Sequence, residues 1–218
     1  QGTQPLHLNW AQIRVRTGDL RQGWHASSLG PQPESPDLDT DSKLMASDVK
    51  ICGMAITDWE RVIAEGVRVP AGLSLGDLTA DLTRMLGDPD PHIRDAVAFP
   101  TIATWISEGI YDDLLSALGD GMCTGLRVGL GESETDTVFR RSFSALVLAE
   151  CIDRDNQANV LSDHTILSWG DQLTTWLTRE NDLRGFVVAK GYAHAIAHGG
   201  DALAALSRSP KIGRMELL

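Results

Sequence analysis

Four polar side chains near the C-terminal end of the chain are spaced like one face of a helix. Lys190, His194, His198 and Asp201 are separated by four, four and three positions, and side chains at such spacings lie above one another on a helix. Two histidines four positions apart can chelate one metal ion, and Asp201 could add an oxygen ligand. Alternatively, His194 or His198 could be a general base that Asp201 orients. A solvated or internally hydrogen-bonded polar face is the third interpretation.

The same stretch lacks the glutamate of the HExxH motif, which disfavours a zinc protease. His194, His198 and Asp201 are thus the candidate catalytic residues and weak candidates for a metal site, and we expect no cofactor.

Two other groups of charged residues could contribute to a site. Glu180, Asp182 and Arg184 lie near the start of the same predicted helix. Asp182 as the cap, and a salt bridge from Arg184 to Glu180 or to an acid on the neighbouring helix, would account for them. Arg140 and Arg141 are adjacent, and because neighbouring side chains on a helix point about 100° apart, one should face inward. An inward arginine close to the histidines could bind carboxylate or phosphate. The candidate ligand-binding residues are therefore Lys190, His194, His198, Arg140, Arg141, Glu180 and Arg184.

The charge of the chain excludes several classes of partner. The 218 residues carry a formal net charge of −11, and residues 73–207 hold 20 Asp and Glu against 9 Lys and Arg. An acidic body repels nucleic acid and anionic membrane surfaces. No apolar run reaches the roughly 20 residues that span a bilayer, and no signal peptide is visible. Cys52, Cys123 and Cys151 are far apart, so we expect a cytoplasmic protein with reduced thiols.

The N-terminal quarter of the chain differs from the rest. Residues 27–48 are rich in Ser, Pro and Asp, and we expect residues 1–50 to form an irregular or disordered arm. Residues 51–72 should contain a linker and a short helix, over 57–66, with Thr57 and Glu60 as a capping box and Gly66 at its end.

Residues 73–207 have the apolar spacing of helices, and residues 208–218 form a tail. Helices joined by short polar turns predict an all-α fold, an antiparallel helical array. The turn at Asp90-Pro91 resembles that of a HEAT repeat, so we expect a HEAT-like α-α superhelix. A loop is predicted at residues 125–134, with Ser133 or Thr135 capping the helix after it. The predicted helices span 75–86, 91–109 with a kink at Pro100, 112–124, 136–154, a segment that Ser162 opens, and 181–207.

Several segments of this helical part resemble a known family. They are Phe139-Arg-Arg-Ser-Phe-Ser-Ala-Leu, Glu180-Asn-Asp-Leu-Arg-Gly-Phe and Lys190-Gly-Tyr-Ala-His-Ala-Ile-Ala-His-Gly-Gly-Asp. They are similar to the bacterial family catalogued as domain of unknown function 2785, and the resemblance covers about residues 75–207. It implies a helical, HEAT-like fold and no particular activity. A tyrosine at position 192 departs from the family, where tryptophan is usual.

These observations favour a scaffold that binds a protein or peptide partner, because stacked helix pairs present an extended surface. The alternative is an enzyme, or a protein that binds a small anionic ligand, with its site at His194, His198 and Asp201. The sequence does not indicate an oligomeric state.

Overall fold

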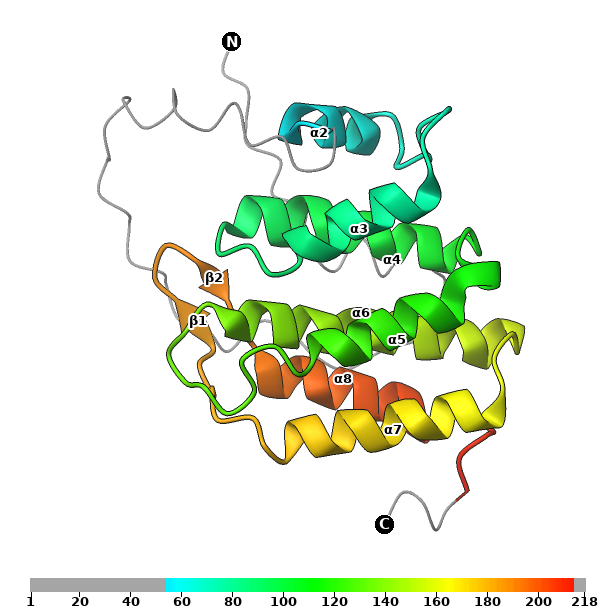
Figure 1. Ribbon diagram of the computed structural model, residues 1–218, viewed down its shortest axis with the longest axis vertical. Helices are drawn as coiled ribbons and strands as arrows, with labels where there is room; N and C mark the ends of the chain where they lie inside the picture. Colours follow the sequence, from blue (N-terminus) through cyan, green and yellow to red (C-terminus); the bar gives the residue numbers. More distant parts are fainter. Residues whose placement is uncertain (1–53, 214–218) are drawn as a thin grey trace, which may run out of the picture. The chain divides into compact units, whose positions relative to one another are not determined.

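The computed structural model describes residues 54–213 of the chain, and these residues are mostly helical. The predicted arm at 1–50, Cys52 and the end of the tail lie outside the described residues. Two short non-α segments, the π-helix η2 (His92–Ala98) and the 3₁₀-helix η3 (Asp112–Leu114), precede α4 and α5. The α-helices are α2 (Ile56–Ala64), α3 (Leu75–Met85), α4 (Phe99–Ser107), α5 (Leu115–Gly125), α6 (Thr137–Ala158), α7 (Asp163–Leu177) and α8 (Ala195–Ser207) (Figure 1).

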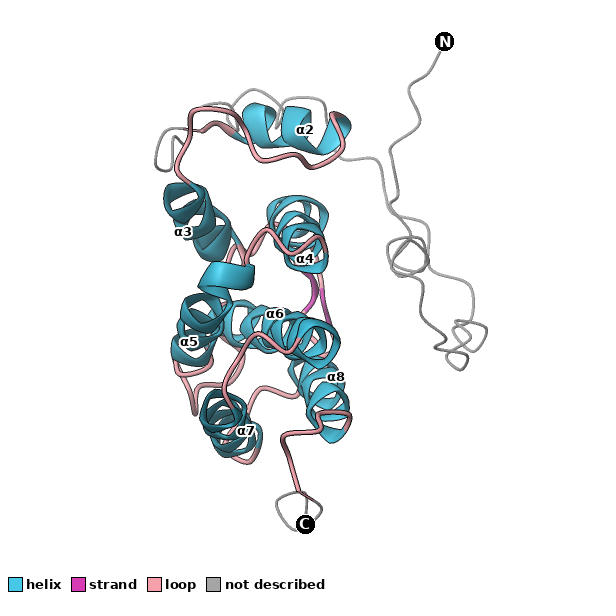
Figure 2. Ribbon diagram, turned by 90° about the vertical axis from the view of Figure 1, so that its right-hand side faces the viewer, coloured by secondary structure: helices cyan, strands magenta, loops and turns pink. Residues whose placement is uncertain are grey.

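From α3 onward the helices form two layers. Helices α3, α5 and α7 lie in one layer and α4, α6 and α8 in the other (Figure 2), and consecutive helices run in opposite directions (Figure 1). Helix α6 is central, since it contacts α4, α5 and α8. It is buried along much of its length, and its buried positions include Phe139, Phe143 and Leu148. The all-α antiparallel array predicted from the sequence is therefore confirmed.

Two helices begin at the serine caps that the sequence predicts. The Ser74 hydroxyl accepts a hydrogen bond from the Asp77 N–H at 3.4 Å, and the Ser162 hydroxyl accepts one from the Thr165 N–H at 3.1 Å. Such caps satisfy backbone donors that have no partner inside the helix. The apolar stripe of α7 then faces the core, with Trp169 and Trp176 almost fully buried.

The predicted helix 91–109 is interrupted by a change of helix type. Residues His92–Ala98 are π-helical, and α4 begins at Phe99, whose N–H bonds to the carbonyl of Arg94. Pro100 therefore lies in the first turn of α4, where its lack of an N–H group removes no hydrogen bond within α4 itself. The wider π-helical turn accommodates the proline next to it.

Other helix ends differ slightly from the prediction. The N-cap of α6 is Asp136 and not Ser133 or Thr135, and α6 continues to Ala158 and ends at Asn159, whose φ is 53°. Helix α5 begins later than predicted because residues 112–114 form a 3₁₀ turn.

The prediction of one helix over 181–207 is wrong in its first half. Strands β1 (Phe186–Val187) and β2 (Gly191–Tyr192) form an antiparallel hairpin, and α8 begins only at Ala195. The backbone here is held by partners outside a helix. The Asp182 carboxylate accepts the N–H groups of Arg184 and Glu134, and the Arg94 guanidinium donates to the carbonyl of Lys190.

The polar stripe predicted on one helix face therefore does not exist. Lys190 lies in the hairpin, and His194 is the N-cap of α8, with a left-handed φ of 52°. Only His198 and Asp201 lie within α8.

The described residues contain neither a membrane-spanning helix nor an exposed cysteine. None of the helices between residues 54 and 213 is both long and apolar enough to cross a bilayer. Cys123 and Cys151 are buried free thiols. Burial raises the pKa of Cys123 to about 12 and that of Cys151 well above its usual range, so both are small apolar core residues.

Candidate functional site

The residues singled out from the sequence gather at one end of the array, on the left in Figure 1. Helices α3, α5 and α7 end there, α6 and α8 begin there, and the hairpin connects α7 to α8. The residues form several separate contacts at this end and not one pocket.

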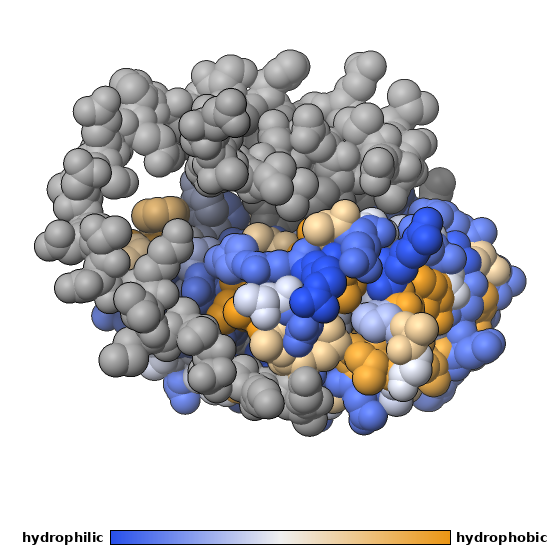
Figure 3. Space-filling view, turned by 90° about the horizontal axis from the view of Figure 1, so that it is seen from above, coloured by the Kyte–Doolittle hydropathy of each residue, from blue (hydrophilic) through white to orange (hydrophobic). Residues whose placement is uncertain are grey.

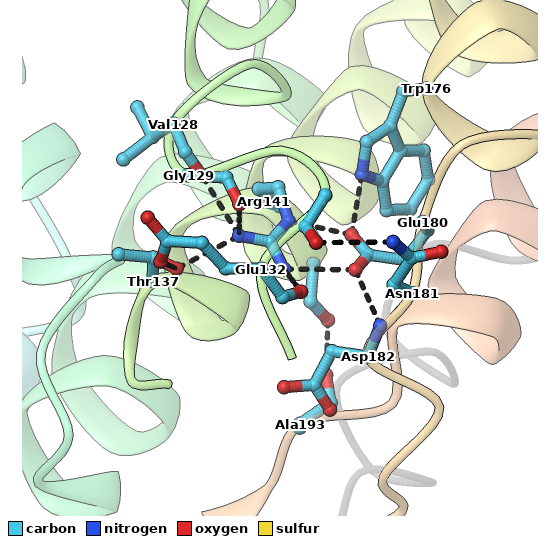
Figure 4. A network of polar contacts seen from close by, with 12 residues as sticks. Val128, Gly129, Glu132, Thr137, Arg141, Trp176, Glu180, Asn181, Asp182 and Ala193 are labelled. Carbon is cyan, nitrogen blue, oxygen red and sulfur yellow. Dashed lines mark hydrogen bonds and ion pairs between the residues drawn. The ribbon is translucent and has the colours of Figure 1, made fainter. Parts of the chain in front are cut away.

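The inward arginine of the adjacent pair is Arg141, and its partner is Glu180. Neither side chain is exposed, and two hydrogen bonds join them: Nε to Oε2 at 2.6 Å and Nη2 to Oε1 at 2.8 Å (Figure 4). The Arg141 Nη1 also donates to the carbonyls of Val128 and Gly129 and to the Thr137 hydroxyl, each at 2.9 Å. The buried charge thus binds the loop at residues 126–134, called the glycine-rich loop below, as well as Glu180.

The remaining acceptor capacity of Glu180 is also used within the protein. Trp176 Nε1 donates to Oε2 at 2.8 Å, and the Asp182 N–H donates to Oε1 at 2.9 Å (Figure 4). A carboxylate with four donors around it is well stabilised in its charged form. Glu180 therefore connects the end of α7 with the segment that leads into the hairpin.

Asp182 and Arg184 continue this network toward the loop. Asp182 accepts from the N–H of Glu134 at 2.9 Å, and Arg184 donates to the Thr135 carbonyl at 2.7 Å. The two side chains also pair with each other at 2.7 Å. The hydrogen bonds from Arg184 are the main reason that the pKa of Asp182 is lowered against its burial, and the same contact raises the pKa of Arg184. Among the described residues Arg184 therefore pairs with Asp182, and not with Glu180 or an acid of a neighbouring helix, the two partners suggested by the sequence.

The hairpin is also attached to α6 and to η2. The Lys190 ammonium contacts both carboxylate oxygens of Asp136 at 2.7 Å. On the other side the Lys190 carbonyl accepts from Arg94, which is fully buried and lies over the Phe139 ring at 4.1 Å from its centroid. Arg94 therefore joins η2 to the hairpin, two segments that are far apart in the sequence.

His194 is partly buried beside two other rings. Its ring lies 4.4 Å from the ring of Tyr192 and 6.0 Å from that of His198 (centroid distances). Partial burial lowers its pKa, so the neutral imidazole is favoured at this position.

His198 is paired with a buried serine that the sequence did not single out as a site residue. The Ser142 hydroxyl lies 2.8 Å from Nδ1 of His198 and donates to the carbonyl of Ala193. Because the hydroxyl proton is used on Ala193, His198 acts as the donor to Ser142 in this arrangement. The pair ties α6 to the start of α8 and does not have the arrangement of an activated serine nucleophile, in which the histidine accepts the serine proton.

The described residues do not assemble the suggested metal site. Between residues 54 and 213 no three His, Cys, Asp or Glu side chains are placed to hold one ion, so His194, His198 and Asp201 do not form such a group.

Arg140 differs from the other candidates because it has no carboxylate partner among the described residues. Its side chain passes Gly87 and Gly125, at the ends of α3 and α5. Burial alone lowers its pKa to about 10. Its side chain thus lies on the side of α3 and α5, whereas His198 is within α8 and His194 is the N-cap of that helix.

The feature that the sequence analysis missed is a group of exposed apolar side chains in the hairpin and α8. Val188 is 83% and Leu183 is 70% exposed. The helix predicted over 181–207 would have distributed these residues around its faces, so the sequence alone gave no reason to group them. The other members are Phe186, Tyr192, Ile196 and Leu203.

Comparison with known proteins concerns this same part of the chain. The family model described as "Protein of unknown function (DUF2785)" matches residues 126–218. Over this range the chain is similar to that family. The resemblance predicted from the sequence is thereby confirmed over this range, which contains the Arg141–Glu180 network, the hairpin and α8, whereas residues 75–125 lie outside the match. The chain matches none of the curated proteins and none of the solved structures at a significant level.

Proposed function

We propose that the chain is a protein-binding scaffold, HEAT-like in its two-layer arrangement, whose contact surface is the hairpin and the outward face of α8. The observation that carries the proposal is the exposure of large apolar side chains along this single stretch, 183–203. Exposed apolar groups that cluster in this way mark interaction sites more often than scattered ones do.

The outward face of α8 supports this proposal by its lack of charge. The exposed positions of the helix are Ile196, Ala197, Gly200, Leu203 and Ser207. A surface helix normally carries charged side chains on its solvent face. On the surface seen from above, the side on which α2 lies in Figure 1, hydrophilic side chains are mixed with apolar ones (Figure 3).

Ring contacts make the apolar surface of the hairpin continuous with the start of α8. Phe186 and Tyr192 are cross-strand neighbours, with ring centroids 5.1 Å apart. Tyr192 in turn packs on His194, which is the N-cap of α8. The hairpin and the helix therefore present one surface to a partner.

The partner that fits this surface is an amphipathic helix of another protein with Lys or Arg along its flanks. Helix α8 packs on α6 and α7, and its free face is where a further helix of the array would lie. A Cβ atom added at Gly200 would meet nothing within 4 Å, so an incoming helix can approach the backbone closely there. Residues 54–213 carry 23 Asp and Glu against 13 Lys and Arg, so basic flanks would be attracted.

In this proposal the charged residues named from the sequence position the surface. Arg141, Glu180, Arg184 and Lys190 all have charged partners within the protein. They fix the loop and the hairpin, and their charges are compensated within the protein.

Site-specific photo-crosslinking tests the proposal. A photoreactive amino acid at Val188, in full-length protein mixed with native lysate, should crosslink a helical segment of a partner, and the same group at exposed Thr174 on α7 should not. A synthetic peptide of the captured segment should then bind the wild-type protein, and Val188→Asp/Ile196→Asp should weaken binding at least about tenfold. Equal crosslinking from both positions, or crosslinks only to a second copy of the chain, would overturn the proposal.

A further inference from the structure

A shallow groove lies beside α7, in the layer of α3, α5 and α7 (Figure 2), and none of its lining residues belongs to the proposed contact surface. Its walls are the start of the glycine-rich loop, with Arg127 and Leu130, and the second half of α7, with Gln172, Thr175 and Trp176, followed by Arg179. Its volume is about 200 Å³. Drug-sized ligands occupy pockets of about 300–1,000 Å³, so this groove has room only for a smaller molecule.

The two arginines of the groove stand out among the basic residues of the protein. Of the 13 Lys and Arg between residues 54 and 213, nine are in ion pairs with Asp or Glu. The four without such a pair in this range are Arg68, Arg127, Arg140 and Arg179. Two of the four therefore line the same groove, in a protein with a large excess of carboxylates.

One of these arginines is held in place by an uncharged partner. Arg127 Nη2 donates to Oε1 of Gln172 at 2.5 Å, and the amide of Gln172 is itself directed by a contact of 3.4 Å from its Nε2 to the Ser168 hydroxyl. The guanidinium thus bridges the loop and α7, and no carboxylate among the described residues pairs with it. Its remaining N–H donors are available to a ligand.

The groove contains little negative charge. Asp171 is the one carboxylate among its lining residues, and it pairs with no Lys or Arg among the described residues. Two guanidinium groups against one carboxylate leave a net positive charge, and guanidinium groups bind planar or tetrahedral oxyanions through paired hydrogen bonds.

We propose that this groove binds a small oxyanion, a molecule with carboxylate or phosphate groups that Arg127 and Arg179 contact together. The ligand is no larger than a small dicarboxylate, because the groove offers about 200 Å³. The site is distinct from the hairpin and α8, so it adds a ligand to the proposed scaffold and does not depend on it.

Binding can be measured with inorganic phosphate and with succinate as probes. Calorimetric titration of the full chain, at an ionic strength held constant with sodium chloride, should give saturable binding of at least one of the two. Arg127→Gln and Arg179→Gln should each weaken binding about tenfold. Asp171→Asn should strengthen binding, because it removes a negative charge of the protein from beside the negatively charged ligand.

The matched control is Arg68→Gln, which removes an exposed arginine that also has no ion pair but lies outside the groove. It should leave binding unchanged. Melting temperatures without ligand should stay near the wild-type value in all four variants, since the substituted side chains are exposed. Absence of saturable binding for both probes, or an equal loss in Arg68→Gln, would overturn the proposal. Val188→Asp/Ile196→Asp should retain binding, which separates this site from the proposed protein contact.

Discussion

Arg141 and Glu180 form an ion pair through two hydrogen bonds, and both side chains are fully buried. The pair joins α6 to the end of α7, and through the carbonyls of Val128 and Gly129 it also fixes the loop between α5 and α6. It is a fully buried connection between three segments at this end of the array.

Glu180→Gln should therefore destabilise the protein strongly. Removing one charge of a buried pair leaves the other without compensation, which costs about 3–5 kcal/mol. We expect that loss in the free energy of unfolding, measured by urea denaturation. Lys190→Gln, which breaks the exposed pair with Asp136, is the control and should cost at most about 1 kcal/mol. Similar losses in the two variants would contradict the importance assigned to the buried pair.

Two glycines of α5 should respond in opposite directions to alanine. A Cβ at Gly119 would lie 2.1 Å from the Trp169 ring, whereas a Cβ at Gly121 would meet nothing within 4 Å. Gly119→Ala should lower the free energy of unfolding by about 1–3 kcal/mol through overpacking. Gly121→Ala should raise it by about 0.5–1 kcal/mol, because alanine is the better helix former. Thermal unfolding monitored by circular dichroism gives both values, and a stable Gly119→Ala variant would show that α5 and α7 are not packed so closely.

The hairpin turn stores backbone strain at Ala189. Its φ is 62°, in the left-handed region, and the Lys190 N–H bonds to the Val187 carbonyl to close the turn. Glycine adopts this conformation without steric cost, so Ala189→Gly should stabilise the protein by about 0.5–1 kcal/mol. Ala197→Gly, on the exposed side of α8, should destabilise it by a similar amount. If the two substitutions have the same sign in chemical denaturation, the turn geometry is different.

Acidification should lower the free energy of unfolding, in part because His194 becomes protonated. Burial lowers its pKa in the folded state below the usual value of 6.5, so the unfolded chain binds a proton more readily. Its contribution to stability is present above pH 6.5 and is lost as the pH falls through the folded-state pKa. His194→Asn keeps a residue that tolerates positive φ and removes the titration. The stability difference between wild type and variant should shrink on acidification, and a constant difference from pH 7.5 to 5 would exclude this role.

The serine caps show how local sequence decides local structure. Ser74 and Ser162 precede apolar residues at helical spacing, and both begin helices as predicted. Helical spacing gave a wrong prediction at Lys190 and His194. The Lys190 carbonyl accepts a hydrogen bond from Arg94, which is distant in the sequence, and the His194 N–H bonds to the Arg184 carbonyl, outside any helix. A pattern of residue types does not record such contacts.

By itself the sequence determined that the described chain is an array of antiparallel helices, where most of them lie, and which family residues 126–218 resemble. Periodic apolar residues, caps and glycines act over a few positions, so they can be read without a structure. Only the tertiary structure decided that Arg141 pairs with Glu180, that His198 meets Ser142, and that the region before α8 is a hairpin with exposed apolar side chains. These features depend on which residues approach one another across layers, and that follows from the packing of the whole array.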